Sequence, residues 1–486
     1  MTSIKLVDVS IRDGNQSLWG AVGLNTPQIL QIAPTMDRVG FEALDFSSST
    51  AMGMSVKRFA ENPWERIRRT KQLMPNTPLQ FIGTGFRFIS WEIQHPEFMQ
   101  LTYDKLVENG MERFVVMDPM HDIDAMLRTA SMYRKAGASC VIAALVYTVS
   151  DVHDDYYYAR MAKQLAKSPD IDRFYIKDPA GLLSPVRART LIPAVRANIG
   201  NKPFELHSHC TISQAPLTYM EAAEAGIDVL QVGCGPLGGG SSLPEAEQTV
   251  RNLREMGYDI DIDDHALSKV CNYFARLAEA EGQPAGQPMH FDAAFLKHQV
   301  AGGVMSTTRR QLQELKLEHH FDDVMDEVMQ VRADLGYPIM VTPFPQMVCT
   351  QALYNVIGSE RYENVADQIV LYALGKFGRP SVPIDQNVLG KILNRPRAAE
   401  LKEDVELKTL SEMRRQFSSK LSDEEFILRA TLPAEQVDRM VANGAAKSRY
   451  SPETKSVIRV LESLDAKRNR SLDVSNGSTR LQVRAN

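Results

Sequence analysis

The chain has 486 residues, of which 44% are hydrophobic and 24% are charged, and its net charge is −5. These values are ordinary for a globular protein of two or three domains, and they give no reason to expect binding to nucleic acid or to an anionic membrane. No apolar run approaches the roughly 18–20 residues that span a bilayer. Residues 1–9 lead into a strand-like run with no signal peptide, and the five cysteines are scattered. We therefore expect a reduced, cytoplasmic protein with no membrane insertion.

Short apolar runs alternate with amphipathic segments along the first half of the chain. We expect strands at Ile4–Val9, Ala43–Phe46, Leu79–Gly83, Phe114–Met117, Cys140–Leu145, Arg173–Ile176, Pro203–Leu206 and Val229–Val232. The segments between them, such as those at 26–39, 64–73, 124–136, 156–166, 186–199 and 215–225, have helical periodicity. Eight such strands over about 240 residues are typical of a closed (β/α)8 TIM barrel, an α/β fold. An open doubly wound sheet is the alternative, but no Gly-x-Gly-x-x-Gly follows the first strand.

Two histidines one residue apart, His207 and His209, end the seventh expected strand. Residues i and i+2 of a strand point to the same side, so both imidazoles face one way. Neutral imidazoles that converge on one point form half of a divalent-metal site. A solvated strand end is the alternative interpretation.

Other polar residues follow the expected strands, namely Asp13, Asp45, Asp118 and Lys177. In such barrels the chemistry lies at the carboxyl ends of the strands. One carboxylate and two imidazoles form a plausible three-ligand site with an open position. Lys177 becomes a ligand only if it is neutral or carbamylated by CO2, and pairing with Asp178 is the alternative. The glycine-rich stretch at 233–240 is either a phosphate cradle or a tight turn.

Several ordered motifs resemble one enzyme family. They are Arg12-Asp13-Gly14-Asn15-Gln16-Ser17, Ile176-Lys177-Asp178-Pro179-Ala180-Gly181, His207-Ser208-His209-Cys210-Thr211, His298-Gln299-Val300-Ala301-Gly302-Gly303, Val341-Thr342-Pro343, and the stretches at 351–357 and 360–362. Over residues 4–395 the chain is similar to the carboxyltransferase segments of pyruvate carboxylase and of the oxaloacetate decarboxylase alpha subunit. The shorter motifs are shared with a wider barrel superfamily that includes hydroxymethylglutaryl-CoA lyase.

This resemblance implies a domain organisation and a set of site residues. A carboxyltransferase barrel is expected at 1–275 and a helical carboxylase-type domain with a C-terminal helical extension at 276–467, and the Ser-, Asn- and Arg-rich stretch 468–486 is predicted to be disordered. The implied metal ligands are Asp13, carbamylated Lys177, His207 and His209, with zinc expected before manganese or cobalt. The implied catalytic residues are Thr211, which moves a proton between biotin and the substrate methyl group, with Lys177 and Gln16. We expect the substrate-binding residues to be Arg12, Gln16, Asp45, Thr84, Arg87 and Asp118, of which the resemblance itself implies Gln16.

Two departures from the family pattern affect the expected substrate and partners. Thr84 and Val115 stand where pyruvate-handling members carry arginines, and neither side chain can clamp a carboxylate. The acceptor is then either a 2-oxo acid such as pyruvate or oxaloacetate, or a different enolisable carbonyl compound. No Met-Lys-Met-type biotinyl segment occurs, so we expect biotin on a separate biotin carboxyl carrier protein, with a biotin carboxylase subunit and a homodimer of this chain.

Two other functions stay open from the sequence. The first is a metal-dependent carbon–carbon lyase or acyltransferase of the hydroxymethylglutaryl-CoA lyase type, which the glycine-rich stretch favours. The second is a non-catalytic scaffold subunit, which the missing arginines would allow.

Overall fold

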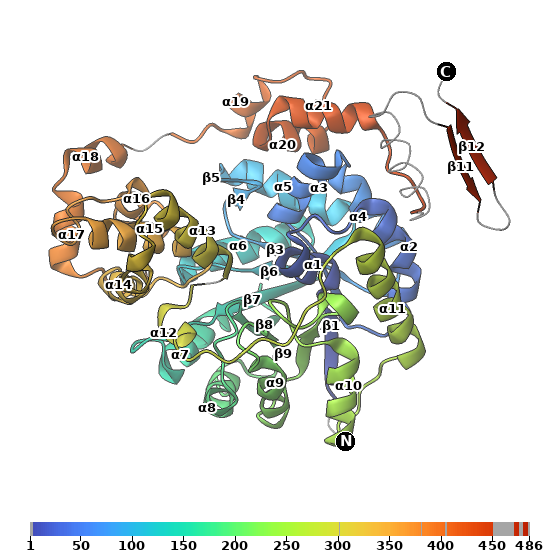
Figure 1. Cartoon of the computed structure of the whole chain (residues 1–486), viewed down its shortest axis with the longest axis horizontal. Coiled ribbons are helices and arrows are strands. Elements are labelled where there is room, and N and C mark those ends of the chain that lie inside the picture. Colours follow the sequence, from blue (N-terminus) through green and yellow to red (C-terminus); the bar gives the residue numbers. More distant parts are fainter. Residues whose placement is uncertain are drawn as a thin grey trace.

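The computed structural model describes residues 3–300, 302–380, 382–403, 406–450, 471–475 and 480–484. Its centre is a closed barrel of parallel strands in the order β1-β10-β9-β8-β7-β6-β3-β2 (Figure 1). The strands are β1 (Lys5–Asp8), β2 (Ala43–Ser48), β3 (Leu79–Gly83), β6 (Met111–Val116), β7 (Cys140–Val146), β8 (Arg173–Asp178), β9 (Phe204–Ser208) and β10 (Val229–Val232). The predicted TIM barrel is confirmed, and each expected strand overlaps an observed one.

Helices surround the barrel because the segments between the strands are amphipathic and begin at good N-caps. Asn25 forms a capping box with Gln28, for example, and Asp122 caps the helix after β6. The helices are α1 (Asn15–Trp19), α2 (Thr26–Met36), α3 (Ser49–Phe59), α4 (Pro63–Leu73), α5 (Pro96–Glu108), α6 (Ile123–Ala136), α7 (Asp155–Leu165), α8 (Pro185–Arg196), α9 (Ala215–Glu224), α10 (Ala246–Glu255) and α11 (Asp264–Glu281). Short elements complete this half of the chain, namely η1 (Ser10–Gly14), η2 (Gly235–Leu237), β4 (Arg87–Phe88) and β5 (Ser90–Ile93).

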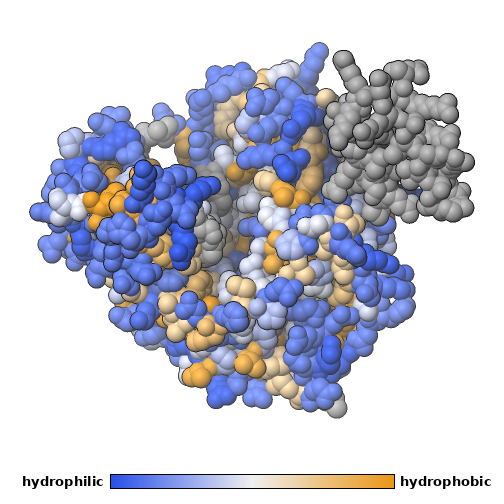
Figure 2. Space-filling model, viewed as in Figure 1, coloured by the Kyte–Doolittle hydropathy of each residue, from blue (hydrophilic) through white to orange (hydrophobic). Residues whose placement is uncertain are grey.

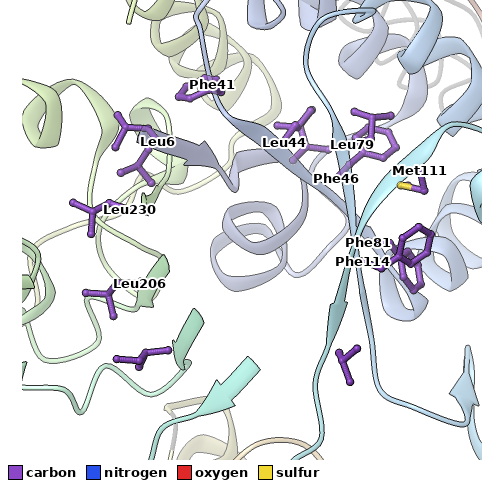
Figure 3. Close-up of a cluster of buried hydrophobic side chains, with 14 of the residues drawn as sticks. Leu6, Phe41, Leu44, Phe46, Leu79, Phe81, Met111, Phe114, Leu206 and Leu230 are labelled. Carbon is purple, nitrogen blue, oxygen red and sulfur yellow. The ribbon is translucent and has the colours of Figure 1, made fainter. Parts of the chain in front are cut away.

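The main core lies between the barrel and its helices. Figure 3 shows strand side chains such as Leu6, Leu44, Phe81, Leu206 and Leu230, all of which are buried. The surface is different, since Figure 2 shows hydrophilic residues over most of one face, interrupted by separate hydrophobic patches.

A second, helical lobe follows the barrel and has its own hydrophobic core (Figure 1). Its elements are α12 (Phe295–His298), α13 (Gly302–Glu314), η3 (Glu318–His320), α14 (Phe321–Asp334), α15 (Phe344–Ile357), α16 (Asp367–Ala373), α17 (Gln386–Leu393) and α18 (Pro396–Lys402). Gln299 joins this lobe to the end of β7, because its Oε1 accepts a hydrogen bond from Thr148 Oγ1 (2.8 Å) and its Nε2 donates to the Val149 carbonyl (2.7 Å).

The C-terminal helices return to the barrel instead of extending the helical lobe. These helices are α19 (Leu410–Arg414), α20 (Asp423–Thr431) and α21 (Ala434–Asn443). Helix α20 contacts α5, and α21 contacts α3. The Phe426 ring lies edge-on to Phe98 with 6.0 Å between centroids, and both side chains are fully buried. The C-terminal helical extension therefore shares the core of the barrel.

The last part of the chain contains two short strands, β11 (Ser471–Ser475) and β12 (Arg480–Arg484), which pair antiparallel. We expected disorder from 468 onward, and the other residues of that stretch lie outside the described ones. The two strand sequences alternate polar and apolar residues, which is the period of a strand. Among the residues that the structure describes, no helix combines the length and apolar character needed to cross a bilayer.

Candidate functional site

Four of the predicted site residues meet at the carboxyl end of the barrel. Asp13 lies in the π-helical turn η1 that follows β1, Lys177 near the end of β8, and His207 and His209 at the end of β9. Lys177 Nζ lies 3.3 Å from Asp13 Oδ2 and 2.9 Å from His207 Nε2. His207 Nε2 lies 3.2 Å from Asp13 Oδ2 and 3.1 Å from His209 Nε2. All four side chains are buried, so these polar atoms converge away from bulk water.

The rings of both histidines are held by partners outside the cluster. His207 Nδ1 lies 2.8 Å from Gln231 Oε1, and His209 Nδ1 lies 2.6 Å from the Ser241 carbonyl oxygen. Since both partners accept hydrogen bonds, each Nδ1 carries the proton and donates it. Each Nε2 then presents its lone pair to the cluster, which is the tautomer that a metal-ligating imidazole needs.

Burial and neighbouring charges set the protonation states of these groups. Burial lowers the pKa of the Lys177 amine, and it lowers the pKa of His207 to about 3, helped by the nearby Lys177 charge. Burial alone would raise the pKa of Asp13, but the charges of Arg12 and Lys177 outweigh it and hold that pKa well below its usual range. The cluster therefore combines an ionised Asp13 carboxylate, a neutral His207 imidazole and a Lys177 amine that is easier to deprotonate than an exposed lysine.

Arg12 lies beside the cluster and is held by two carboxylates. Its Nη1 lies 2.9 Å from Asp13 Oδ2, and its Nε donates to Asp45 Oδ2 at 2.7 Å. Asp45 is fully buried in β2, where the pairing with β3 shifts register between Asp45 and Ser47. This irregularity beside a functional site is a common way to redirect a strand residue. The Asp13 and Asp45 carboxylates together orient Arg12. Asp45 itself is not among the residues that line the neighbouring cavity of about 510 Å³.

The donor set fits a divalent cation. The donor atoms of Asp13, His207 and His209 all lie within 4.8 Å of one another. One carboxylate and two imidazoles with oriented Nδ1 atoms are the ligands that zinc and similar first-row ions accept. A neutral Lys177 amine can also react with CO2 and give an anionic oxygen donor.

Thr211 and Gln16 lie around this cluster. Thr211 is half-buried just after β9, and its Oγ1 donates to the Ala180 carbonyl oxygen. Gln16 is exposed in α1 and lines a cavity of about 510 Å³, which we call the metal cavity. The other residues that line the metal cavity include Arg12, Asp13, Thr84, Lys177, His209 and Met340.

The remaining predicted substrate residues border a second cavity. This cavity has a volume of about 370 Å³ and is lined by Arg87 and Asp118, whereas Thr84 lines both cavities. Burial raises the pKa of Asp118 to about 6, although Oδ1 accepts the Met120 N–H at 2.9 Å. Of the predicted substrate residues, all but Asp45 are thus divided between two neighbouring cavities, and Asp45 lines neither.

The structure distinguishes the alternatives for Lys177 and for the glycine-rich stretch at 233–240. Asp178 does not pair with Lys177, because its oxygens accept the N–H groups of Leu182 and Leu183 at 2.8 and 2.9 Å. The glycine-rich stretch is a tight turn packed on other backbone, since a Cβ on Gly238 would lie 2.7 Å from the Gly233 carbonyl oxygen. Close backbone approach therefore explains these glycines without a phosphate.

Two groups that orient the histidines, the Gln231 side chain and the Ser241 carbonyl, are not among the residues predicted from the sequence. Gln231 lies on β10 inside the barrel, and its Nε2 donates to Glu205 Oε2 at 3.1 Å. Alternation along β10 places Gln231 on the opposite face from the core residues Leu230 and Val232, and that signal could have identified it. The second group is the Ser241 backbone carbonyl, which no side-chain pattern reveals.

Comparisons with known proteins indicate the family to which this chain is related. The sequence family described as the conserved carboxylase domain matches residues 295–481. The chain is 35% identical over 394 residues to the B subunit of pyruvate carboxylase from Methanocaldococcus jannaschii, covering 80% of this chain and 68% of that protein. It is 30% identical over 448 residues to the 2-oxoglutarate carboxylase large subunit of Hydrogenobacter thermophilus, covering 90% of this chain and 68% of that protein.

Two further similarities extend the comparison. The chain is 29% identical over 387 residues to the methylmalonyl-CoA carboxyltransferase 5S subunit of Propionibacterium freudenreichii, covering 79% of this chain and 76% of that subunit. The solved carboxyltransferase domain of Rhizobium etli pyruvate carboxylase superposes with a TM-score of 0.81 at 21% identity, covering 99% of this chain and 84% of that chain. At that identity the structure supports the fold alone.

Proposed function

Because the chain belongs to the carboxyltransferase family of biotin-dependent carboxylases, we propose that it moves a carboxyl group between carboxybiotin and an enolisable carbonyl compound. The observation that carries this proposal is the buried convergence of Asp13, Lys177, His207 and His209 at the carboxyl end of the barrel. A divalent metal held there, zinc before manganese or cobalt, would polarise the acceptor's carbonyl oxygen and stabilise an enolate.

The chain's own residues have separate tasks in this proposal. Gln231 and the Ser241 carbonyl fix the rings of His207 and His209, so that both Nε2 atoms face the site. We infer that Lys177 serves as a ligand in its carbamylated form, because its lowered pKa makes the neutral amine accessible for reaction with CO2.

Proton transfer is assigned to Thr211. Its Oγ1 has a defined acceptor in the Ala180 carbonyl, which orients the hydroxyl at the mouth of the barrel. In the direction of acceptor carboxylation, the bond between CO2 and the carboxybiotin nitrogen breaks, the hydroxyl relays the proton of the acceptor's α-carbon to that nitrogen, and the resulting enolate carbon bonds to the released CO2. Gln16 lines the metal cavity and is placed to hydrogen-bond the acceptor.

The names of the relatives indicate which partners this chain would have, because they describe subunits of larger carboxylases. The pyruvate carboxylase relative is a B subunit and the 2-oxoglutarate carboxylase relative is a large subunit, so each name implies companion chains. We propose that biotin reaches this barrel on a biotin carboxyl carrier protein charged by a biotin carboxylase subunit, and that the chain acts as a homodimer within that assembly in the cytoplasm.

Decarboxylation of β-keto acids tests the proposal in the reverse direction. Purified, metal-loaded chain is given oxaloacetate or acetoacetate, with and without free biotin, and CO2 release is compared with the spontaneous rate. Biotin-stimulated release from either acid is expected, and it should fall about 10²–10⁴-fold in Thr211→Ala, the contribution of a positioned proton-transfer group, but less in Thr211→Ser. If biotin stimulates CO2 release from neither acid, the proposed carboxyltransferase activity is contradicted and the lyase or scaffold alternatives are favoured.

A further inference from the structure

The two cavities of the site meet at a shared wall. The cavity of about 370 Å³, which we call the arm cavity, opens beside the metal cavity, and the residues Thr84, Met117 and Thr342 line both. Barrel residues supply one side of the arm cavity and the helical lobe supplies the other, through Phe344 and Phe377. We propose that the acceptor extends an uncharged, largely apolar arm, an aryl or branched alkyl group, from the metal cavity past Thr84 into the arm cavity. This inference rests on the proposed carboxyl transfer at the metal cavity.

The charges along the metal cavity favour an acceptor without a carboxylate next to its carbonyl. Arg12 and Lys177 are the long basic side chains that the structure describes there. Arg12 already faces Asp13 and Asp45, and Lys177 lies 3.3 Å from Asp13. A substrate carboxylate would have to compete with two buried, preorganised carboxylates for Arg12, and Lys177 in its carbamylated form offers it no positive charge. Thr84, at the junction of the cavities, offers only a hydroxyl.

The arm cavity has the size and lining for an apolar group. Aromatic rings and methionines form much of its wall, including Phe86, Met117, Met126, Phe344 and Phe377. An apolar cavity of about 150 Å³ is large enough to hold benzene in an engineered protein, so about 370 Å³ leaves room for a phenyl ring or a branched chain.

The arm cavity is lined by three basic and two acidic side chains, and its arginine nearest the helical lobe already has partners. The Arg87 guanidinium lies 5.5 Å from the Phe377 ring centroid and donates from Nη2 to the Lys376 carbonyl at 3.3 Å. The Asp118 carboxylate also interacts electrostatically with the Arg87 guanidinium. Arg128 and Lys376 contribute positive charge, and Asp122 adds a negative one. Because Arg87 is already held by the Phe377 ring, the Lys376 carbonyl and Asp118, an anionic arm would gain little from this cation over a neutral arm that covers the apolar wall.

The barrel order separates the arm cavity from the proton-transfer side. Thr211 follows β9, and Thr84 follows β3, and these strands are four positions apart in either direction around the barrel. They therefore lie on opposite sides of the mouth. Biotin must approach Thr211 to exchange a proton, which leaves the β3 and β6 side for the acceptor's arm.

Affinity measurements on the full, metal-loaded chain test this inference without biotin. Ligand-observed NMR would give dissociation constants for acetone, phenylacetone, pyruvate and 2-oxoglutarate. Phenylacetone is expected to bind at least about tenfold more tightly than acetone, the scale of an apolar group in a matching pocket, and more tightly than both acids. Tighter binding of pyruvate or of 2-oxoglutarate than of phenylacetone would overturn the inference, the latter in favour of an anionic arm.

Variants that fill the arm cavity test whether the apolar arm of the ligand binds there. Ala125→Phe fills the cavity from α6, and Ile93→Trp fills it from β5, where the Ile93 residue is already 41% exposed and a larger ring is tolerated. Each should reduce the phenylacetone-to-acetone affinity ratio toward one. Ser131→Phe adds the same ring on an exposed position of α6 and should leave the ratio unchanged. An unchanged ratio in both filling variants would overturn the inference. Biotin-stimulated CO2 release is measured separately on each, so a failure of the proposed function is recognised independently of the affinity ratio.

Discussion

A single methyl group at position 181 should disturb the catalytic end of the barrel. Gly181 has a φ of +69°, and a Cβ there would overlap both Thr211 Oγ1 and the His209 carbonyl oxygen. Left-handed backbone costs an alanine about 1–2 kcal/mol, and an overlap that must be relieved by moving packed atoms costs about 1–3 kcal/mol more. Gly181→Ala should therefore lower the free energy of unfolding by about 2–5 kcal/mol, the sum of these two costs.

Gly200 provides the matched control for this variant. Its φ is +60°, and nothing lies within 4 Å of an added Cβ. Gly200→Ala should therefore show only the backbone cost of about 1–2 kcal/mol and keep its activity. Urea unfolding and biotin-stimulated CO2 release measure both effects. If the two variants lose equal stability and Gly181→Ala remains as active as Gly200→Ala, the close packing of Thr211 on residue 181 is refuted.

Three further perturbations test other parts of the molecule. Gln231→Leu removes the acceptor for His207 Nδ1 and should weaken metal binding about 10–100-fold, seen in competition with a chelator; equal affinity would refute that role. Phe426→Ala should destabilise the protein by about 3–5 kcal/mol because this ring is fully buried against the barrel, whereas Val441→Ala, 51% exposed, should change it little; equal effects would contradict the docking of α20. Burial lowers the pKa of His121 from 6.5 to about 3, so the unfolded state binds more protons in that window and stability falls as the pH drops through it. His121→Asn should lose less stability between pH 6.5 and 3, measured by urea unfolding, and an identical pH profile would count against a buried neutral histidine.

The sequence predicted the barrel because each strand and helix carries a local signal. The two-residue spacing of His207 and His209 predicts that both face one side, and their strand ends near Asp13 and Lys177. These residues could be placed together from topology alone, since the carboxyl ends of all barrel strands meet at one face.

Other parts depend on contacts that no local pattern encodes. The arm cavity forms between α6 and residues 342–378, which are more than 200 positions apart, so its size could not be predicted. Arg87 and Asp118 are expected at the substrate, and the position of Arg87 beside the Phe377 ring of the helical lobe depends on a contact that the sequence does not reveal. The return of α20 to the barrel is likewise a tertiary contact between distant residues, Phe426 and Phe98.

Exchange of the acceptor's protons is the decisive measurement for carboxyl transfer, because it requires metal, biotin and Thr211 to act together. Acetone, phenylacetone and pyruvate are incubated in D2O with the metal-loaded chain, and deuterium in the group next to the carbonyl is followed by NMR. We expect exchange into at least one of them that requires biotin, is abolished in Thr211→Ala and persists in Thr211→Ser. Absence of exchange from all three, or exchange that is independent of biotin and unchanged in Thr211→Ala, would contradict the proposed carboxyl transfer.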